Sequence, residues 1–365
     1  MEILILCKVV DNFGDIGVVF RLAKNLLRLR PTLKISLVVS DLHSFKAIFP
    51  QIDELAENQS AFGMKIFRWN MDKKNALEFF PQIPSVILEC FQCGRPDWLE
   101  EILFADDFSQ KIQIINIDYL TAEDWADDFH LLKSGTRKTN VKKIIFMPGF
   151  TKKTGGLLLD SQKIKNSDER FSKDVFKILI FSYERDFSQI VGAISCISKK
   201  TRVKVFLAKS KNVAPFLDAF EKSEKSFEVE ELPFLSQDDW DSFLYSCDFL
   251  FVRGEDSMAR ACLSGKPFVW HAYVQDENWQ LVKVDALLQR IKQHFENESD
   301  FNLISRFWKW YNGEKIQENP QKILETILEK SANGKFDSAF KNFAKSLEEN
   351  GDLAENLFNY IDRIF

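Results

Sequence analysis

Glycine and proline are scarce in this chain of 365 residues, which contains only 14 Gly and 10 Pro. Hydrophobic residues make up 45% of the sequence and charged residues 28%, which excludes collagen-like and largely disordered chains. At roughly 150 residues per domain, the length predicts about two domains. We therefore expect two folded domains, each with a hydrophobic core of its own.

Basic residues are not in excess. Lys and Arg number 49 against 54 Asp and Glu, which gives a net charge of −5, and no long basic block is present. Binding to nucleic acid through neutralised phosphates is therefore disfavoured. No stretch approaches the ~20 apolar residues of a membrane span, and the first ten residues lack the basic leader and cleavage site of a secretion signal. We expect no direct nucleic-acid partner and no membrane partner.

Cysteine and histidine are few and are not arranged as metal ligands. Cys90 and Cys93 form a single CxxC pair, and the four histidines are not spaced for metal binding. Neither a GxSxG nor a Walker pattern is present. The six cysteines lie in mostly apolar segments, as is typical of buried, reduced thiols. We therefore expect a cytoplasmic protein without a metal site.

The N-terminal half alternates apolar runs with helical patterns. Residues Ile3–Val10 predict a strand that is covered on both faces, and a helix is predicted from about Val18 to Arg30. Further strands are expected at Ile35–Val39, Lys65–Trp69, Val86–Cys90, Ile112–Ile117 and Lys143–Met147. This order predicts a parallel, doubly wound α/β sheet.

A polar stretch, Lys152–Asp174, is the best candidate for a linker, and a second alternating set follows it. The expected strands are Ile178–Phe181, Val203–Leu207, Phe227–Leu232, Phe249–Val252 and Phe268–His271, and the expected helices are Asp186–Ser198, Asp238–Ser246, Asp256–Ser264 and Asn278–Ile291. The tail, Pro320–Phe365, has a helical pattern throughout. The sequence therefore predicts two Rossmann-like halves with a helical tail, and a ligand site between such halves.

The loop DNFGDIG at residues 11–17 follows the first strand, where dinucleotide folds hold phosphate. It contains only Gly14 and Gly17, so GxGxxG is absent and Asp11 and Asp15 replace the glycine-rich cradle. An aspartate beside a helix start is also an ordinary cap, and carboxylates repel phosphate. From these residues alone, a catalytic acidic pair and a helix cap are about equally supported.

A second candidate lies within residues 249–264, where an apolar strand ends at Arg253 and Gly254. Glu255, Asp256 and Ser257 then open a helix. Backbone N–H groups at such a junction suit a phosphate, Ser257 adds a hydroxyl donor, and Arg253 can neutralise a diphosphate. The alternative is a capped strand–helix turn with a surface arginine.

Aromatic residues follow two strands of the second half. Phe181 and Tyr183 lie at the end of one predicted strand, and Phe234 and Gln237 lie at the end of another. Two rings can enclose a nucleobase, and the Gln237 amide can pair with its edge. In a chain so rich in Phe, the simpler interpretation is that these rings belong to the core.

Three other segments receive no catalytic role. Thr154–Gly156 and His271–Asn278 are expected to be loops that face the space between the halves. The acidic run Glu123–Asp128 is expected to be the start of a solvated helix.

Taken together, these segments resemble the bacterial protein-arginine rhamnosyltransferases, which modify translation elongation factor P. The resemblance is carried by CKVVDNFGDIG from Cys7, MPGFTKKTGGLL from Met147 and RGEDS from Arg253, in that order, and it extends over the whole chain. It implies a GT-B fold of two Rossmann-like domains facing across a cleft, with a C-terminal helix that crosses back to the first domain. Residues 1–165 plus about 350–365 would form the acceptor-side domain, and residues 170–349 the nucleotide-sugar donor domain.

The resemblance also implies an inverting transfer of L-rhamnose from TDP-β-L-rhamnose to an arginine of elongation factor P. It further implies that the transfer needs no metal or other cofactor and that it activates the factor to rescue stalled ribosomes. The implied catalytic residues are Asp15 as general base, Asp11 beside it, and Glu255 near the sugar. The implied donor-binding residues are Phe181, Tyr183, Phe234, Gln237, Arg253, Asp256, Ser257, Asn12, Phe13 and Gly14.

Two positions depart from the family pattern, Phe20 where Trp is common and Lys152 where an acid is common. Neither lies in the acidic pair or in RGEDS. Other functions stay open on the residues alone. They are a GT-B glycosyltransferase with a non-protein acceptor, a nucleotide-sugar 2-epimerase, and a nucleotide-responsive binding module without catalysis.

Overall fold

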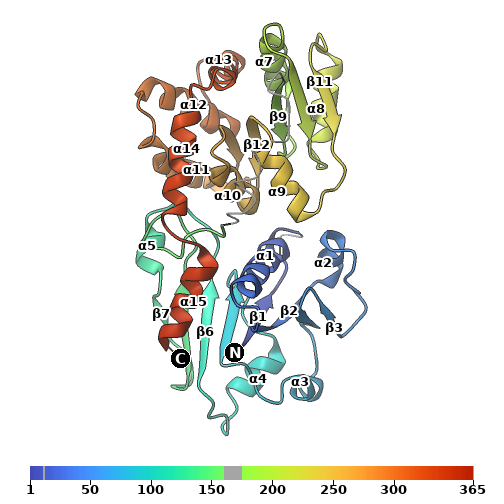
Figure 1. Cartoon of the computed structure of the whole chain (residues 1–365), viewed down its shortest axis with the longest axis vertical. Coiled ribbons are helices and arrows are strands. Elements are labelled where there is room, and N and C mark those ends of the chain that lie inside the picture. The colour runs from blue at the N-terminus through green and yellow to red at the C-terminus, as the bar shows by residue number, and fades with distance from the viewer. Residues whose placement is uncertain (11–12, 160–174, 365) are drawn as a thin grey trace. The chain divides into compact units, whose positions relative to one another are not determined.

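The computed structural model describes residues 1–10, 13–159 and 175–364, which form two compact units (Figure 1). Unit 1 is Met1–Leu159 together with Asn350–Phe365, and unit 2 is Asp160–Glu349. Each unit contains one sheet, mainly parallel in unit 1 and wholly parallel in unit 2, with helices packed against it.

The sheet of unit 1 has the strand order β3-β4-β2-β1-β5-β6-β8-β7. Its six inner strands are parallel, and the edge strands β3 and β7 are antiparallel to their neighbours. The strands are β1 (Glu2–Cys7), β2 (Lys34–Val39), β3 (Asn58–Ala61), β4 (Met64–Arg68), β5 (Val86–Cys90), β6 (Ile112–Ile117), β7 (Lys133–Ser134) and β8 (Val141–Phe146). The prediction of a parallel, doubly wound sheet is confirmed.

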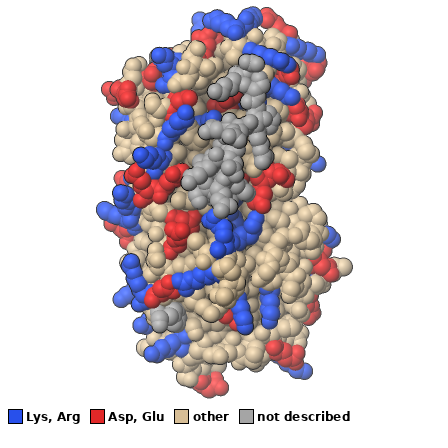
Figure 2. Space-filling model, viewed as in Figure 1, with Lys and Arg blue, Asp and Glu red and all other residues tan. Residues whose placement is uncertain are grey.

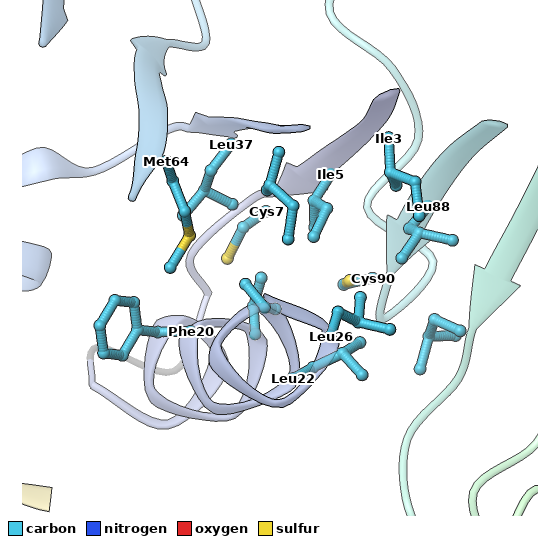
Figure 3. Packing of buried hydrophobic residues seen from close by; sticks show 14 of the residues in the cluster. Ile3, Ile5, Cys7, Phe20, Leu22, Leu26, Leu37, Met64, Leu88 and Cys90 are labelled. Carbon is cyan, nitrogen blue, oxygen red and sulfur yellow. The ribbon is translucent and has the colours of Figure 1, made fainter. Parts of the chain in front are cut away.

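The two faces of this sheet bury alternate side chains. Ile3 and Ile5 point to one face, in a core shared with α1 (Gly14–Leu29) and α15 (Leu353–Ile364), as Figure 3 shows for α1. Leu4 and Leu6 point to the other face, in a core shared with α3 (Lys73–Phe79) and α4 (Asp97–Leu103). Two short helices complete the unit, α2 (Leu42–Ile48) and α5 (Trp125–Phe129). Burial on both faces explains why the inner strands are continuous apolar runs.

Two boundaries at the first strand differ from the prediction. Strand β1 ends at Cys7 rather than Val10, whose side chain is 76% exposed. Helix α1 begins at Gly14, four residues before the predicted start at Val18. Val9 and Val10 continue the apolar pattern of the strand in the sequence, but the pairing of β1 with its neighbouring strands ends at Cys7.

The segment from Lys152 to Leu159 belongs to unit 1, so the predicted linker is wrong over these residues. Leu157 forms a bridge with Asp352, and the Asp352 carboxylate accepts the N–H of Leu159 at 2.7 Å. Gly156 has φ +78, and a Cβ atom there would lie 2.4 Å from the carbonyl oxygen of Gly351. Thr154–Gly156 therefore packs against the chain that leads into α15. The rest of the predicted linker, residues 160–174, lies outside the described residues.

The sheet of unit 2 is parallel throughout, with the order β11-β10-β9-β12-β13. Its strands are β9 (Phe176–Ile180), β10 (Val203–Leu207), β11 (Glu228–Glu231), β12 (Phe249–Arg253) and β13 (Phe268–His271). In chain order within the unit this is 3-2-1-4-5, the Rossmann order. His271, at which the predicted strand and the predicted loop meet, is the last residue of β13.

The helices of unit 2 are α7 (Ser188–Ser198), α8 (Val213–Glu221), α9 (Gln237–Tyr245), α10 (Glu255–Ser264), α11 (Gln280–Lys292), α12 (Glu298–Tyr311), α13 (Pro320–Ala332) and α14 (Asp337–Glu348), with a 3-10 turn, η2 (Asp276–Asn278). The tail is not one continuous helix but α13, α14 and α15, interrupted at Gly334 and Gly351. Helices α13 and α14 pack in unit 2 on α7 and α10, whereas α15 packs on α1 of unit 1. The expected return of the C-terminal helix to the first domain is confirmed.

Candidate functional site

The carboxyl ends of β9, β12 and β13 lie next to one another in unit 2. Phe251 pairs with Ile180, and Arg253 pairs with His271 in the parallel register. The residues that follow these strands therefore meet at one edge of the sheet, where ligands of open α/β folds bind. They include most of the residues that the sequence suggested for a nucleotide.

Arg253 lies between two aromatic rings at this edge. Its guanidinium carbon is 4.8 Å from the ring centre of Phe181 and 4.7 Å from that of Tyr183. The Nε atom is buried and has no hydrogen-bond partner among the described residues. The structure thus brings Arg253, Phe181 and Tyr183 together, and it leaves one buried donor of the guanidinium available for a ligand.

Helix α10 begins directly after Arg253. Gly254 adopts φ +68, which favours glycine, and no atom lies within 4 Å of a Cβ built there. Glu255 and Asp256 occupy the first turn, both half-buried, and Ser257 is buried. The N-cap residue supplies no side chain to the first N–H groups, so the helix presents its partially positive end at the same edge as Arg253.

A buried polar network supports this edge, and the sequence did not indicate it. The Ser182 hydroxyl lies 2.7 Å from Nδ1 of His271 and 2.8 Å from the Tyr311 hydroxyl. The same Nδ1 accepts the N–H of Tyr183 at 3.3 Å. Burial lowers the pKa of His271 to about 3, with further lowering by Arg185 and Arg253. His271 is therefore neutral at physiological pH, and its acceptor nitrogen fixes the backbone at Tyr183.

Phe234 and Gln237 lie on the segment that connects β11 with α9. Phe234 is 53% exposed, and Gln237 is the first residue of α9. The N-cap residue of that helix, Ser236, accepts the N–H of Asp239 at 3.2 Å. Trp240 of the same helix meets Phe181 edge to face, with ring centres 5.0 Å apart. This contact connects α9 to the group formed by Arg253, Phe181 and Tyr183, which is called the Arg253 cluster below.

In unit 1, Asp15 lies in the first turn of α1 and is only 4% exposed. Its Oδ2 atom accepts the N–H of Val10 at 2.8 Å, so the carboxylate closes the loop between β1 and α1. The thiol of Cys7 has a pKa raised by burial and, to a smaller extent, by the charge of Asp15. Asp15 therefore lies close to the carboxyl end of β1.

The other residues of this loop have different positions. Phe13 is the N-cap residue of α1 and is 47% exposed, and Gly14 is the first helical residue. The capping role that the sequence offered for Asp15 is not observed, because Asp15 lies inside the helix and the cap position belongs to Phe13. Asp11 and Asn12 lie outside the described residues.

Metal clusters and membrane helices are both absent from the part of the chain that the structure describes. No group of three or more His, Cys, Asp or Glu side chains that could hold a metal ion occurs in residues 1–10, 13–159 and 175–364. In the same ranges, no helix combines the length and apolar character needed to cross a membrane. Lys and Arg alternate with Asp and Glu over the face in view in Figure 2.

Solved structures with the same fold share this pair of Rossmann-like units. A structure described as the basis of EarP-mediated arginine glycosylation of translation elongation factor EF-P matches with a TM-score of 0.62 at 20% identity, over 100% of this chain and 99% of that chain. The UDP-GlcNAc 2-epimerase of Neisseria meningitidis, in a structure with bound UDP-GlcNAc, matches with a TM-score of 0.51 at 10% identity, over 100% of each chain. The fold is thus that of the GT-B class of nucleotide-sugar enzymes.

Sequence comparison identifies the family. The model of the elongation factor P rhamnosyltransferase family EarP matches residues 3–362. The protein-arginine rhamnosyltransferase of Pseudomonas putida is 32% identical over 332 residues, covering 84% of this chain and 85% of the relative. That of Shewanella oneidensis is 32% identical over 320 residues, covering 78% and 79%. The chain therefore belongs to the EarP family of elongation factor P rhamnosyltransferases, and it is a glycosyltransferase.

Proposed function

We propose that this enzyme transfers L-rhamnose from TDP-β-L-rhamnose to an arginine side chain of translation elongation factor P, with inversion at the anomeric carbon. The binding of the TDP-sugar donor is supported by the Arg253 cluster, where a guanidinium with a buried, unpaired Nε lies beside the N-terminus of α10. Membership of the family supports elongation factor P as the acceptor. Modification of this factor would activate it for the rescue of stalled ribosomes.

Unit 2 holds the TDP moiety in this proposal. Arg253 and the N-terminal amides of α10 neutralise the diphosphate, with the Ser257 hydroxyl as an additional donor. This positive potential stabilises the charge that develops on departing TDP, so the proposed reaction needs no metal and no other cofactor. The proposed donor-binding residues are Phe181, Tyr183, Phe234, Gln237, Arg253, Asp256 and Ser257, with Asn12, Phe13 and Gly14 contributed by the loop of unit 1.

The exposed ring of Phe234 is the proposed stacking surface for thymine. An aromatic ring with half its surface in solvent can cover a planar base without rearrangement of the core. Gln237 supplies a donor and an acceptor at the first position of α9. The buried His271 network then has a structural role, because it holds the Phe181–Tyr183 segment against Arg253.

The acceptor presents a chemical difficulty, because a guanidinium with a pKa above ~12 is protonated and a poor nucleophile. A carboxylate can hydrogen-bond this group, orient one nitrogen, and accept its proton while the bond to the sugar forms. We assign the base role to Asp15 and the holding role to Asp11. Glu255, at the start of α10, binds sugar hydroxyls or positions the acceptor. Attack opposite the diphosphate gives inversion without a covalent intermediate.

The proposed domains follow from these roles. Residues 1–165 plus about 350–365 form the acceptor-side domain, because Asp11 and Asp15 lie there, and residues 170–349 form the donor domain. A cytoplasmic location belongs to the same proposal, and free thiols such as buried Cys7 and Cys90 suit a reducing compartment. The proposal includes no direct contact with nucleic acid or membrane.

The test is NMR spectroscopy of elongation factor P after incubation with the enzyme and TDP-β-L-rhamnose. Inverting transfer predicts an α-linked rhamnose on one arginine, with TDP released in equal amount. A β-linked product would refute inversion. Conversion of the nucleotide sugar without any modified protein would support a 2-epimerase, whose fold is shared, over a transferase.

A further inference from the structure

An exposed aromatic pair lies at the carboxyl edge of the sheet of unit 1. Tyr119 follows β6 and is 40% exposed, and its ring stacks on Phe91, which follows β5, with centres 4.7 Å apart and planes at 22°. A large aromatic ring that retains this much contact with solvent is a ready surface for a cation or a peptide.

The residues around this pair hold the Tyr119 ring in place. The Asp118 carboxylate, only 6% exposed, accepts the Gln92 side-chain amide at 2.8 Å and the N–H of Tyr119 at 2.8 Å. The N–H of Phe91 binds the carbonyl of Ile117 at 2.7 Å. Both loops are therefore fixed to the ends of their strands, and the stacked rings form a preorganised surface.

The pair lies on the same side of unit 1 as Asp15. Cys7, Cys90 and Ile117 are register partners at the ends of β1, β5 and β6, so Tyr119 is two strands from β1, or about 10 Å. Phe91 packs against the core cluster that contains Ile16, the residue after Asp15. A polypeptide on the rings thus runs close to the proposed base.

The chain that follows Tyr119 extends the aromatic and acidic character. Trp125 and Phe129 of α5 are each 43% exposed and meet edge to face at 5.4 Å. No Lys or Arg occurs between Lys111 and Lys133, whereas four half-buried or exposed acidic residues do: Glu123, Asp124, Asp127, which pairs with Lys153 at 3.9 Å, and Asp128. Figure 1 shows that β6 points toward the end of unit 1 at which α5 lies. This surface complements a cationic segment and repels an anionic one.

We propose that Tyr119, stacked on Phe91, and the exposed face of α5 form an acceptor platform for the arginine-bearing loop of elongation factor P. The polypeptide beside the target arginine lies across Tyr119, and the arginine side chain extends from there to Asp15. The acidic residues of α5 attract the cationic target arginine. This inference rests on the proposed function and names the surface of unit 1 that recognises the acceptor.

The first test replaces the ring. Tyr119→Ala should raise the KM for elongation factor P roughly 5- to 30-fold, because the ring no longer packs against the acceptor polypeptide, and leave the KM for TDP-β-L-rhamnose unchanged. Tyr119→Phe keeps the ring and should restore the acceptor KM to within about twofold. An unchanged acceptor KM in Tyr119→Ala, in an assay where the wild-type enzyme modifies the factor, overturns the platform. No modification by the wild-type enzyme refutes the proposed function instead.

The second test changes charge without touching the core. Asp128 is an exposed residue of α5, and Asp107 is an exposed residue before β6, at the opposite edge of the sheet. Asp128→Lys should raise the acceptor KM several-fold at low salt, with a smaller effect at high salt, whereas the matched variant Asp107→Lys should not. Equal effects of the two substitutions would overturn the platform, because only net charge would then matter.

Discussion

Replacement of Asp15 by asparagine tests the proposed base with little change in structure. The side-chain carbonyl oxygen of the asparagine can still accept the N–H of Val10, which the Asp15 carboxylate accepts at 2.8 Å. Because a neutral oxygen replaces the charged acceptor of this hydrogen bond, the free energy of unfolding should fall by about 1 kcal/mol. Asp15→Ala removes the acceptor as well and should destabilise by about 1–3 kcal/mol. The asparagine variant therefore separates chemistry from folding.

The expected effect on catalysis is much larger than the effect on stability. A general base contributes about 10²–10⁴-fold to a rate, which corresponds to about 2.7–5.5 kcal/mol of activation free energy. We expect Asp15→Asn to lose this factor in kcat and to keep its affinity for TDP, because the diphosphate contacts are assigned to unit 2. The assay is the initial rate of product formation at saturating donor and acceptor, with TDP binding by calorimetry as the control.

One result would refute the reasoning about Asp15. A kcat within about threefold of wild type falls far below the ~10²-fold minimum expected of a base and would remove Asp15 from that role. A comparable loss of TDP affinity and of kcat would show instead that the substitution disturbs the donor site.

Three further predictions concern single side chains. Gly156→Ala should lower the free energy of unfolding by about 2 kcal/mol or more, because alanine is strained at a left-handed φ and its Cβ would clash with the backbone of Gly351. The control Gly135→Ala, whose Cβ would meet no atom within 4 Å, should leave thermal unfolding unchanged. Burial lowers the pKa of His271 to about 3 in the folded protein, against 6.5 for an ordinary histidine. Protons therefore favour the unfolded state, and the free energy of unfolding falls as the pH drops from about 6.5 to 3. His271→Asn should flatten this pH dependence in denaturant titrations, and an unchanged pH dependence would contradict the assignment to His271. Arg253→Gln should weaken TDP binding roughly 10- to 100-fold in calorimetry. Arg202→Gln should leave TDP binding unchanged, because Arg202 directly precedes β10, at the amino ends of the strands, where it pairs with the exposed carboxylate of Glu228.

The sequence predicted the fully buried strands well, because strands covered on both faces are continuous apolar runs. Val86–Cys90, Ile112–Ile117, Val203–Leu207 and Phe268–His271 have the same bounds in the sequence prediction and in the structure. The edge strand Asn58–Ala61 was missed, since it is polar, short and partly exposed. The two-residue strand β7 carries no pattern at all.

The site was predictable only where its residues are neighbours in the chain. The turn from Arg253 into α10 was recognised from a strand, a glycine and a helix start in succession. The network of Ser182, His271 and Tyr311 was not, because its members are 89 and 129 positions apart and meet only through the tertiary fold. The close approach of Gly156 to Gly351 could not be predicted for the same reason, since Gly351 lies near the C-terminus.

The most direct test of the account is intact mass spectrometry of elongation factor P after reaction with this enzyme and TDP-β-L-rhamnose. The proposed reaction adds one deoxyhexosyl unit, which fragmentation should place on a single arginine and which should disappear when that arginine is replaced by lysine. An unchanged mass under conditions where the enzyme binds TDP would contradict the assigned acceptor. A sugar on any other residue type would contradict the proposed chemistry of Asp15.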